Sequence, residues 1–206
     1  MDIRQFSQRV AAKQRQIAQL LQRRLPVVVG RLAKNHYQDN FRQGGFVNGG
    51  LHPWPKAKRL SSGRTDAAGN YGTLLSGDKH LFNAIKYIPS DYRVKVSNEL
   101  VYAPIHNWGG TVSVTVTERM RRFAWAKFRE ANGKTKKNAK GKKNSSKKAT
   151  AKQMVSPQAA FWRNLALTKK KKLTIRIPQR QFLGESKELN DKINERIEKE
   201  IRNVLN

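Results

Sequence analysis

The sequence predicts an α+β fold, in which N-terminal helices and a C-terminal amphipathic helix enclose a small, mainly antiparallel sheet. Two patterns predict this class. Apolar residues recur at intervals of three or four near both ends of the chain, and apolar and polar residues alternate in short stretches between them. The chain has 206 residues, of which 37% are hydrophobic, and this suits one domain with a modest core. We therefore expect a single domain over residues 1–206.

The N-terminal region is predicted to be two helices or one kinked helix. Apolar residues at helical spacing begin at Ile3, and the pattern continues beyond Pro26, which interrupts helical hydrogen bonding. The pattern ends near Gly44 and Gly45, because glycine is favoured directly after a helix. Residues 44–72 are dense in Gly, Pro, Ser and Asn, and this composition predicts a long functional loop.

A short helix and three strands are predicted for the middle of the chain. Ser76 is expected to cap a helix over residues 77–85, because a serine side chain can accept a hydrogen bond from the first helical turn. Alternation of apolar and polar residues predicts strands at 92–98, 111–117 and 173–177.

Three further helices are predicted. Residues 120–131 and 157–167 place aromatic residues among basic ones, which suits stacking on nucleic-acid bases but more often indicates a core or a subunit contact. The last segment of the chain has one apolar stripe flanked by Glu and Lys pairs, which predicts an amphipathic helix. The stripe consists of Leu189, Ile193, Ile197 and Ile201.

The chain is strongly basic, with 43 Lys and Arg against 14 Asp and Glu and a formal net charge of +29. Residues 131–184 alone contain 16 basic residues and no acidic one. Such a charge favours polyanionic partners, nucleic acid first and acidic membranes or acidic protein surfaces second. Residues 133–153 have almost nothing to bury, which predicts a Lys-rich flexible insertion. Its candidate nucleic-acid contacts are Lys136, Lys137, Lys140, Lys142, Lys143, Lys147 and Lys148.

Other features of the sequence exclude several classes of protein. It contains no cysteine, so disulfide frameworks and cysteine-based zinc sites are excluded. The N-terminus lacks the apolar core of a signal peptide, and no stretch approaches the roughly 20 apolar residues of a membrane span. We therefore expect a soluble, non-secreted protein with no membrane contact.

The residue patterns that could carry catalysis are incomplete. GTLLSGDK at 72–79 is close to a phosphate-binding loop, but Asp78 occupies the lysine position and its carboxylate would repel phosphates. The four histidines are scattered rather than at metal-ligand spacing. His106 and Asn107 with Asp78 and His80 could form a metal-assisted nuclease site, but paired acidic ligands are missing. The sequence therefore predicts no catalytic residue, no metal ligand and no cofactor.

Five short blocks, in a fixed order, carry a family resemblance. They follow an N-terminal region containing Asn40-Phe41, a Gly44-Gly45-Phe46 turn and Trp54. The blocks are LLSGDKHLFNAI at 74–85, YRVKVSN at 92–98, YAPIHNWGG at 102–110, RMRRFAWAKF at 119–128 and IPQRQFLG at 177–184. With these blocks the chain resembles the phage virion morphogenesis family, the tail completion proteins of contractile-tailed phages and of prophages. The resemblance covers nearly the full chain except about 131–156.

This resemblance implies a structural protein without catalysis. It implies that copies of the chain form a ring, complete the tail end and join it stably to the head together with other tail and head-tail joint proteins. The protein would then assemble in the host cytoplasm and reside in the tail or neck of the virion. The Lys-rich insertion departs from the family's pattern. The alternative function is a sequence-independent nucleic-acid-binding protein, and even a joint protein could make a weak DNA contact.

Two of the blocks hold the residues expected to carry the assembly or structural role. Residues 102–110 are predicted to be a helix-to-strand corner, in which two glycines adopt positive φ angles. After Pro178 ends the preceding strand, Phe182 and Leu183 are predicted to form an apolar plug, and Gly184 and Glu185 to open the terminal helix. The full set is Tyr102, Ile105, His106, Asn107, Trp108, Gly109, Gly110, Pro178, Phe182, Leu183 and Gly184.

Overall fold

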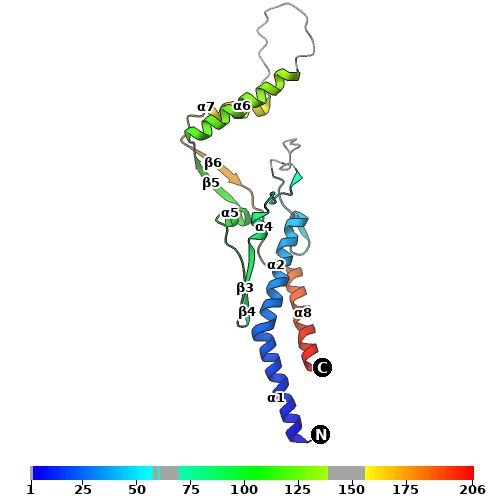
Figure 1. Ribbon diagram of the computed structural model, residues 1–206. Helices are drawn as coiled ribbons and strands as arrows, with labels where there is room; N and C mark the ends of the chain where they lie inside the picture. The colour runs from blue at the N-terminus through cyan, green and yellow to red at the C-terminus, as the bar shows by residue number, and fades with distance from the viewer. Residues whose placement is uncertain (1, 58–59, 61–69, 139–155) are drawn as a thin grey trace, which may run out of the picture. The chain divides into compact units, whose positions relative to one another are not determined.

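The computed structural model describes residues 2–57, 60, 70–138 and 156–206, and of residues 133–138 the backbone alone. Helices are combined with small two-stranded sheets, which confirms the α+β class (Figure 1). The described strands form three separate pairs rather than one sheet. β1 pairs with β2, and β3 with β4, in antiparallel register.

The chain divides into two compact units. Unit 1 comprises Met1–Gly110 and Arg176–Asn206, and unit 2 comprises Thr111–Ile175. The boundary falls within two paired strands, β5 (Gly110–Thr115) and β6 (Lys172–Ile177). Both strands confirm the sequence prediction for this region. The single domain over residues 1–206 stays a prediction, because a compact unit need not fold independently.

Unit 1 begins with three helical segments that follow one another without a break. They are α1 (Ile3–Gln19), the π-helical turn η1 (Leu20–Arg24) and α2 (Leu25–Gln43). Pro26 explains the irregular turn, because proline lacks the N–H that would bind the Gln22 carbonyl four residues earlier. The backbone N–H of Tyr92 donates to this Gln22 carbonyl instead, at 3.2 Å. Pro26 thus leaves the Gln22 carbonyl free to accept a hydrogen bond from Tyr92, which is far away in the sequence.

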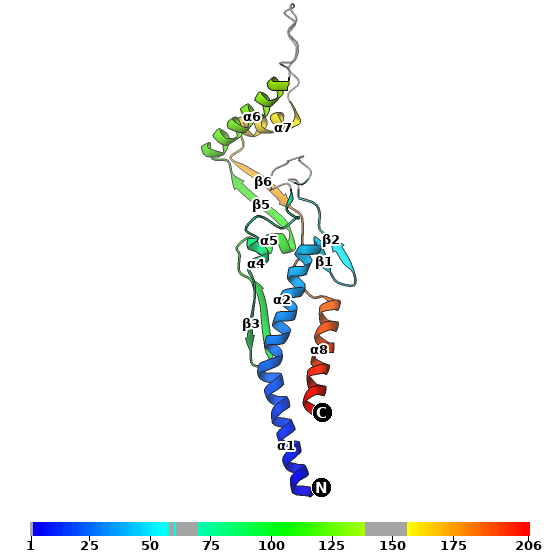
Figure 2. The same cartoon turned by 45° about the vertical axis from the view of Figure 1, so that its right-hand side comes forward.

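The segment after α2 is partly a hairpin, which corrects the prediction of a continuous loop over 44–72. Gly44 ends α2 in the left-handed conformation with φ 70°, as the sequence predicted. β1 (Gly45–Val47) and β2 (Leu51–Pro53) then pair, with Phe46 opposite His52 (Figure 2). Residues 58–59 and 61–69 of the predicted loop lie outside the described residues.

The prediction that Ser76 caps a helix over 77–85 is wrong. The helix α4 spans only His80–Asn83, and its N-cap is Lys79, which has φ 49° and makes no side-chain cap. Ile85 instead begins β3 (Ile85–Ser90), a strand that the sequence did not reveal. β3 forms a hairpin with β4 (Arg93–Asn98), which confirms the strand predicted at 92–98. Pro89 is tolerated in β3 because the hairpin has only two strands and both are edges.

The remaining helices agree with the sequence predictions, with two changes at their ends. They are α5 (Ala103–Trp108), α6 (Glu118–Asn138), α7 (Pro157–Leu167) and α8 (Lys187–Leu205). α6 is longer than predicted, so residues 133–138 of the Lys-rich insertion are helical, and residues 139–153 lie outside the described part of the chain. α8 is opened by Ser186 rather than by Gly184 and Glu185, because the Ser186 hydroxyl accepts from the Leu189 N–H at 3.3 Å.

The hydrophobic core of unit 1 is built from residues far apart in the sequence. Phe182 and Ile85 are fully buried, and Phe41 is 2% exposed. The Phe41 ring lies 5.2 Å from that of Phe182 and 5.4 Å from that of Trp54. Leu81 and Ala103 complete this cluster. α8 lies alongside α2 (Figure 1) and buries Leu189, while Ile193, Ile197 and Ile201 are half-buried, as the predicted apolar stripe requires.

Candidate functional site

Two of the blocks that carry the family resemblance meet at one side chain, Asn107. Asn107 is buried on α5, and its Oδ1 accepts hydrogen bonds from the backbone N–H groups of Phe182 and Leu183, both at 2.9 Å. The backbone N–H of Arg180 donates to the His106 carbonyl at 2.8 Å. After Ile177, where β6 ends, the IPQRQFLG segment is neither helix nor strand. These bonds therefore satisfy backbone groups that burial would otherwise leave unpaired.

Side chains from other elements complete the hydrogen bonding of this segment. The Trp54 indole N–H donates to the Gln181 carbonyl at 2.7 Å, and the Tyr37 hydroxyl donates to the Gly184 carbonyl at 2.8 Å. Asn40, which is fully buried, donates to the Phe182 carbonyl at 3.4 Å and accepts from the Val47 N–H at 3.2 Å. We call Arg180–Gly184 with these partners the junction. The junction ties α2, the β1–β2 hairpin and α5 together around Phe182.

Gly109 allows the two blocks to approach each other closely. Its φ is 71°, and a Cβ atom placed on it would lie 2.8 Å from the Gln179 backbone nitrogen. Any other residue would therefore be strained in its backbone and would also collide with the second block. Gly110 follows with φ 143°, which confirms the predicted corner with two positive φ angles.

The other predicted motif residues lie at different depths. Tyr102 and Trp108 are exposed, at 42% and 67%. Ile105 and Leu183 are half-buried, Pro178 is exposed, and Phe182 is the part of the predicted plug that is fully buried. The helix α5 instead buries Ala103 and Asn107.

A shallow pocket of about 270 Å³ beside the junction contains the two histidines of the incomplete nuclease pattern. His80 and His106 line it together with Tyr102 and Arg180. Burial and the neighbouring Arg180 guanidinium lower the pKa of His106 from its usual value, so its imidazole is neutral near pH 7. The His106 Nδ1 is buried and has no hydrogen-bond partner. His80 Nε2 lies 3.4 Å from Asp78 Oδ2, and both of these side chains are largely exposed.

The described residues also bear on metal sites and on membrane spans. No group of three or more His, Cys, Asp or Glu in the described part of the chain is placed to hold a metal ion. None of the helices within the described ranges is both long enough and apolar enough to cross a bilayer.

The N-terminal half of α1 presents an exposed apolar stripe. Ile3 is 80% exposed, Phe6 58% and Val10 40%, and α1 contains no buried residue. Helix α8 reaches α1 near its own end, where the Lys13 ammonium donates to the Val204 carbonyl. Ile3, Phe6 and Val10 follow the spacing i, i+3, i+7, so they share one helix face. We call this face the α1 stripe.

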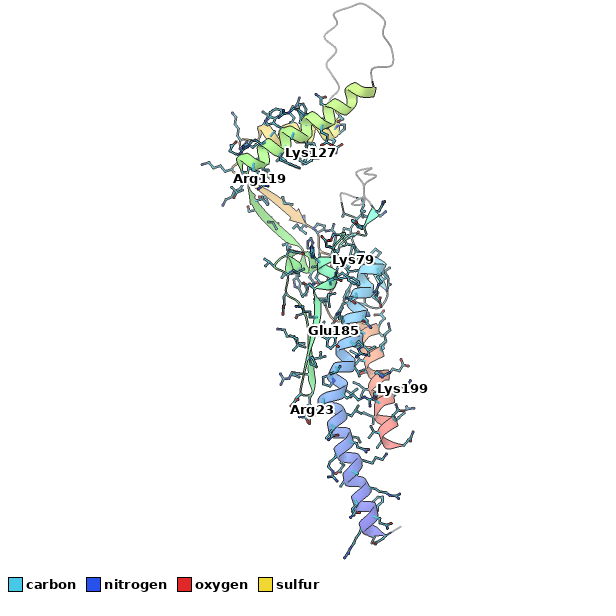
Figure 3. All side chains as sticks on the ribbon, viewed as in Figure 1. Arg23, Lys79, Arg119, Lys127, Glu185 and Lys199 are labelled. Carbon is cyan, nitrogen blue, oxygen red and sulfur yellow. The ribbon has the colours of Figure 1, made fainter. Side chains whose placement is uncertain are left out.

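Three exposed acidic residues lie on the outer face of α8, together with Arg202, whose guanidinium lies 3.5 Å from the Glu198 carboxylate. Asp191, Glu195 and Glu198 are exposed and follow the spacing i, i+4, i+7. They lie opposite the buried side of the helix, on which Glu200 is 3% exposed and pairs with Arg196 at 2.7 Å and Arg24 at 3.2 Å. Lys199, one residue before this buried carboxylate, points away from α2 in Figure 3. The exposed acidic residues of α8 thus lie on another side of the helix than its buried contacts.

Unit 2 has a different surface, in which aromatic rings and cations lie together. α6 and α7 pack through small residues, with Ala124 and Ala159 fully buried. The ring of Trp162 lies 5.8 Å from that of Phe123 and 5.1 Å from that of Phe161. Phe123 and Phe161 remain 53% and 58% exposed. We call these three rings the aromatic ledge.

The predicted lysine contacts are mostly beyond what the structure describes. Lys136 and Lys137 belong to α6, of which only the backbone is described at those positions. Lys140, Lys142, Lys143, Lys147 and Lys148 lie outside the described residues.

Sequence reasoning did not select Tyr37, Asn40 and Trp54 as site residues. A signal existed for two of them, because Tyr37 and Asn40 are polar residues on the face of α2 that also carries Phe41. A polar side chain at such a position needs a partner when it is buried. Nothing local, however, indicates that the partner is a segment more than 140 residues away.

Comparisons with protein-family models, with curated proteins and with solved structures found no match to this chain.

Proposed function

We propose that this chain is a structural protein of a phage or prophage tail, without catalytic activity, which completes the tail end and joins it to the head as a ring of copies. Its partners would be other tail and head-tail joint proteins, and its place the tail or neck of the virion. The resemblance of the five blocks is the starting point of the proposal. The junction supports it, because Asn107 and the glycine corner serve the packing of the scaffold.

The observation that carries the assembly part of the proposal is the α1 stripe. Full burial of an aliphatic or aromatic side chain contributes roughly 1.5–3 kcal/mol of favourable free energy. A stripe of three exposed apolar side chains on one helix face therefore favours contact with a partner surface. The same helix carries Arg4, Arg9 and Arg15 and no acidic residue between positions 3 and 19. A partner surface with acidic groups would complement it.

The exposed Asp191 and Glu195 on the outer face of α8 have the matching charge. In the proposed ring, α1 of one copy lies against α8 of the next copy, with Arg4 and Arg9 near Asp191 and Glu195, and the α1 stripe packs on apolar side chains of that copy. Because the two surfaces differ, each copy has both halves of the contact free for its neighbours. A contact of this head-to-tail kind closes into a ring when the rotation between copies divides a full turn.

The test is the mass of the assembled protein. We expect native mass spectrometry at low protein concentration to find multiples of the 23.6 kDa chain. Phe6→Asp places a carboxylate in the α1 stripe and should leave single chains. Val101→Asp is the matched control, because Val101 is 96% exposed and lies outside the stripe, so it should keep the assembled mass.

A second arm distinguishes the phage role from assembly alone. In a phage or prophage that lacks this protein, heads and tails should accumulate separately, and electron microscopy should find joined particles only when the wild-type chain is supplied. Phe6→Asp should fail to restore them and Val101→Asp should succeed. Wild-type chains that stay single at all concentrations, or joined particles in the absence of the chain, would refute the proposal.

A further inference from the structure

Phe123 and Phe161 of the aromatic ledge are exposed, and cationic side chains lie near the ledge. In an isolated helix pair, large rings at the packing seam would normally be covered, but here the seam is filled by Ala124, Ala159 and Ala166. These small side chains allow α6 and α7 to lie close together, and Phe123 and Phe161 remain at the edge of the contact. Their rings stand almost perpendicular to that of Trp162, at 84° and 73°, so Trp162 supports both from between them.

Cationic side chains lie beside Phe123, one of these rings. Arg119 lies four residues before Phe123 on the same exposed face of α6, and the Lys127 ammonium lies 5.9 Å from the centre of the Phe123 ring (Figure 3). Arg122 is exposed next to Phe123. Arg121, in contrast, donates to the Ala166 carbonyl at 3.4 Å and to the Thr168 carbonyl, so it fastens α7 to α6.

The charge of the whole unit limits what can cover the ledge. Residues 111–175 contain 19 Lys and Arg against 2 Glu, a net charge of +17. Two ledges from two copies would repel each other, because like charges destabilise a contact. A polyanion would be attracted instead, since each neutralised phosphate releases bound counterions. Flat unsaturated groups of such a partner would stack favourably on the two exposed rings.

We propose that the aromatic ledge of unit 2 binds single-stranded nucleic acid without sequence preference, with unpaired bases stacked on Phe123 and Phe161 and phosphates near Arg119 and Arg122. Every base has a flat face, so stacking is indifferent to sequence. In duplex DNA these faces are already stacked on each other, so the ledge favours unpaired bases. This site goes beyond the proposed joint function and does not depend on it.

The test uses the full chain and a fluorescent oligothymidylate of about 16 nucleotides, the upper end of the site sizes common for stacking platforms. Phe161→Ala should weaken binding at least about fivefold, since stacking on one ring has an effect of that order or more. Tyr92→Ala is the matched control, because Tyr92 is also an exposed aromatic residue, at 65%, but lies in unit 1. It should change the affinity less than twofold.

The salt dependence of the affinity separates a defined site from a general attraction to a basic protein. Arg119→Gln with Arg122→Gln should lower the slope of log affinity against log salt by about 1.4, because each single-strand phosphate contact contributes about 0.7. The control pair, Arg31→Gln with Arg93→Gln, removes the same charge from exposed positions of unit 1 and should leave the slope unchanged. Circular dichroism of all four variants should match that of the wild type.

Three results would overturn the proposal. The first is an equal loss of affinity in the unit 1 and unit 2 variants, which would mean attraction by net charge alone. The second is a duplex of the same length competing as well as the single strand, which would remove the role of stacking. The third is tighter binding of unlabelled vesicles with acidic lipids than of the oligonucleotide, which would make the ledge a lipid-binding surface.

Discussion

Unit 1 and unit 2 use the same kinds of side chain in opposite ways. In unit 1, Phe41 and Phe182 are buried against each other at the centre of the core. In unit 2, Phe123 and Phe161 stay more than half exposed, and the described buried apolar residues are the alanines 124, 159 and 166. Aromatic residues at helical spacing therefore build a core in one unit and a surface in the other. In unit 1 the ring of Phe41 is covered by Trp54 and Phe182, which come from other segments of the chain.

The largest expected difference between the units is the effect of removing one of these rings. Phe182→Ala should lower the free energy of unfolding by about 3–5 kcal/mol, because it leaves a cavity in a close-packed core. Phe161→Ala should change it by less than about 0.5 kcal/mol, because the ring is 58% exposed. Urea unfolding followed by circular dichroism measures both. Equal losses would mean that the ledge is a second core and would end the comparison.

Asn107→Ala tests whether the hydrogen bonds of the junction stabilise unit 1 as the packing of its aromatic side chains does. The change leaves the N–H groups of Phe182 and Leu183 without their acceptor, so the unfolding free energy should fall by about 2–4 kcal/mol. Asn164→Ala on α7 is the control, because Asn164 is exposed, and it should have almost no effect. If both variants unfold at the wild-type urea concentration, the junction does not contribute to stability.

Ile197→Asp tests the attachment of α8 to the rest of unit 1. Ile197 is half-buried on the apolar side of α8, and a carboxylate there would lose hydration without gaining a partner. We expect a loss of about 2 kcal/mol and failure to assemble, whereas Asn194→Asp on the same helix should be neutral because Asn194 is exposed. Melting temperature and native mass report the two effects. A normal melting temperature for Ile197→Asp would show that α8 is not needed for the fold.

The sequence predicts the local elements well and their long-range partners poorly. The α+β class, the strands at 92–98, 111–117 and 173–177 and the apolar stripe of α8 follow from periodicity, which is a local property. β3 was missed because Ile85 and Ile88 are three residues apart and Pro89 argues against a strand. The cap at Ser186 was missed because Ser186 lies just beyond Gly184-Glu185, which already resembled a helix start.

In the candidate sites, too, local features could be predicted from the sequence and long-range partners could not. The glycine corner at 109–110 could be predicted, because a positive φ angle is a property of single residues. The role of Asn107 could not, since it depends on backbone groups 75 residues away. The exposure of Phe123 and Phe161 could not be predicted either, because it depends on how many elements pack against the helix pair.

The smallest expected effect is a pH dependence confined to unit 1, since unit 2 contains no histidine. Burial lowers the pKa of both His36 and His106, helped by the positive charges of Lys192 and Arg180 respectively, and Glu188 and Asp39 oppose the shift at His36. The unfolded chain then binds more protons than the folded one below about pH 6.5, so stability falls as the pH drops through that value. Above pH 7 the two histidines should have no effect.

Hydrogen exchange resolved by peptide measures this dependence in each unit. Between pH 7 and pH 5.5 the free energy of opening of α2 and α5 should fall, and that of α6 and α7 should not. His36→Gln with His106→Gln should remove most of the change in unit 1. An equal fall in both units would place the responsible groups elsewhere.

Native mass spectrometry of the full chain with a 16-nucleotide oligothymidylate tests most directly the claim that the two units have separate tasks, assembly for unit 1 and nucleic-acid binding for unit 2. We predict that Phe6→Asp gives single 23.6 kDa chains that still carry the oligonucleotide, and that Phe161→Ala gives wild-type assemblies that do not carry it. Loss of both properties in either variant, or of neither property in both, would contradict the account.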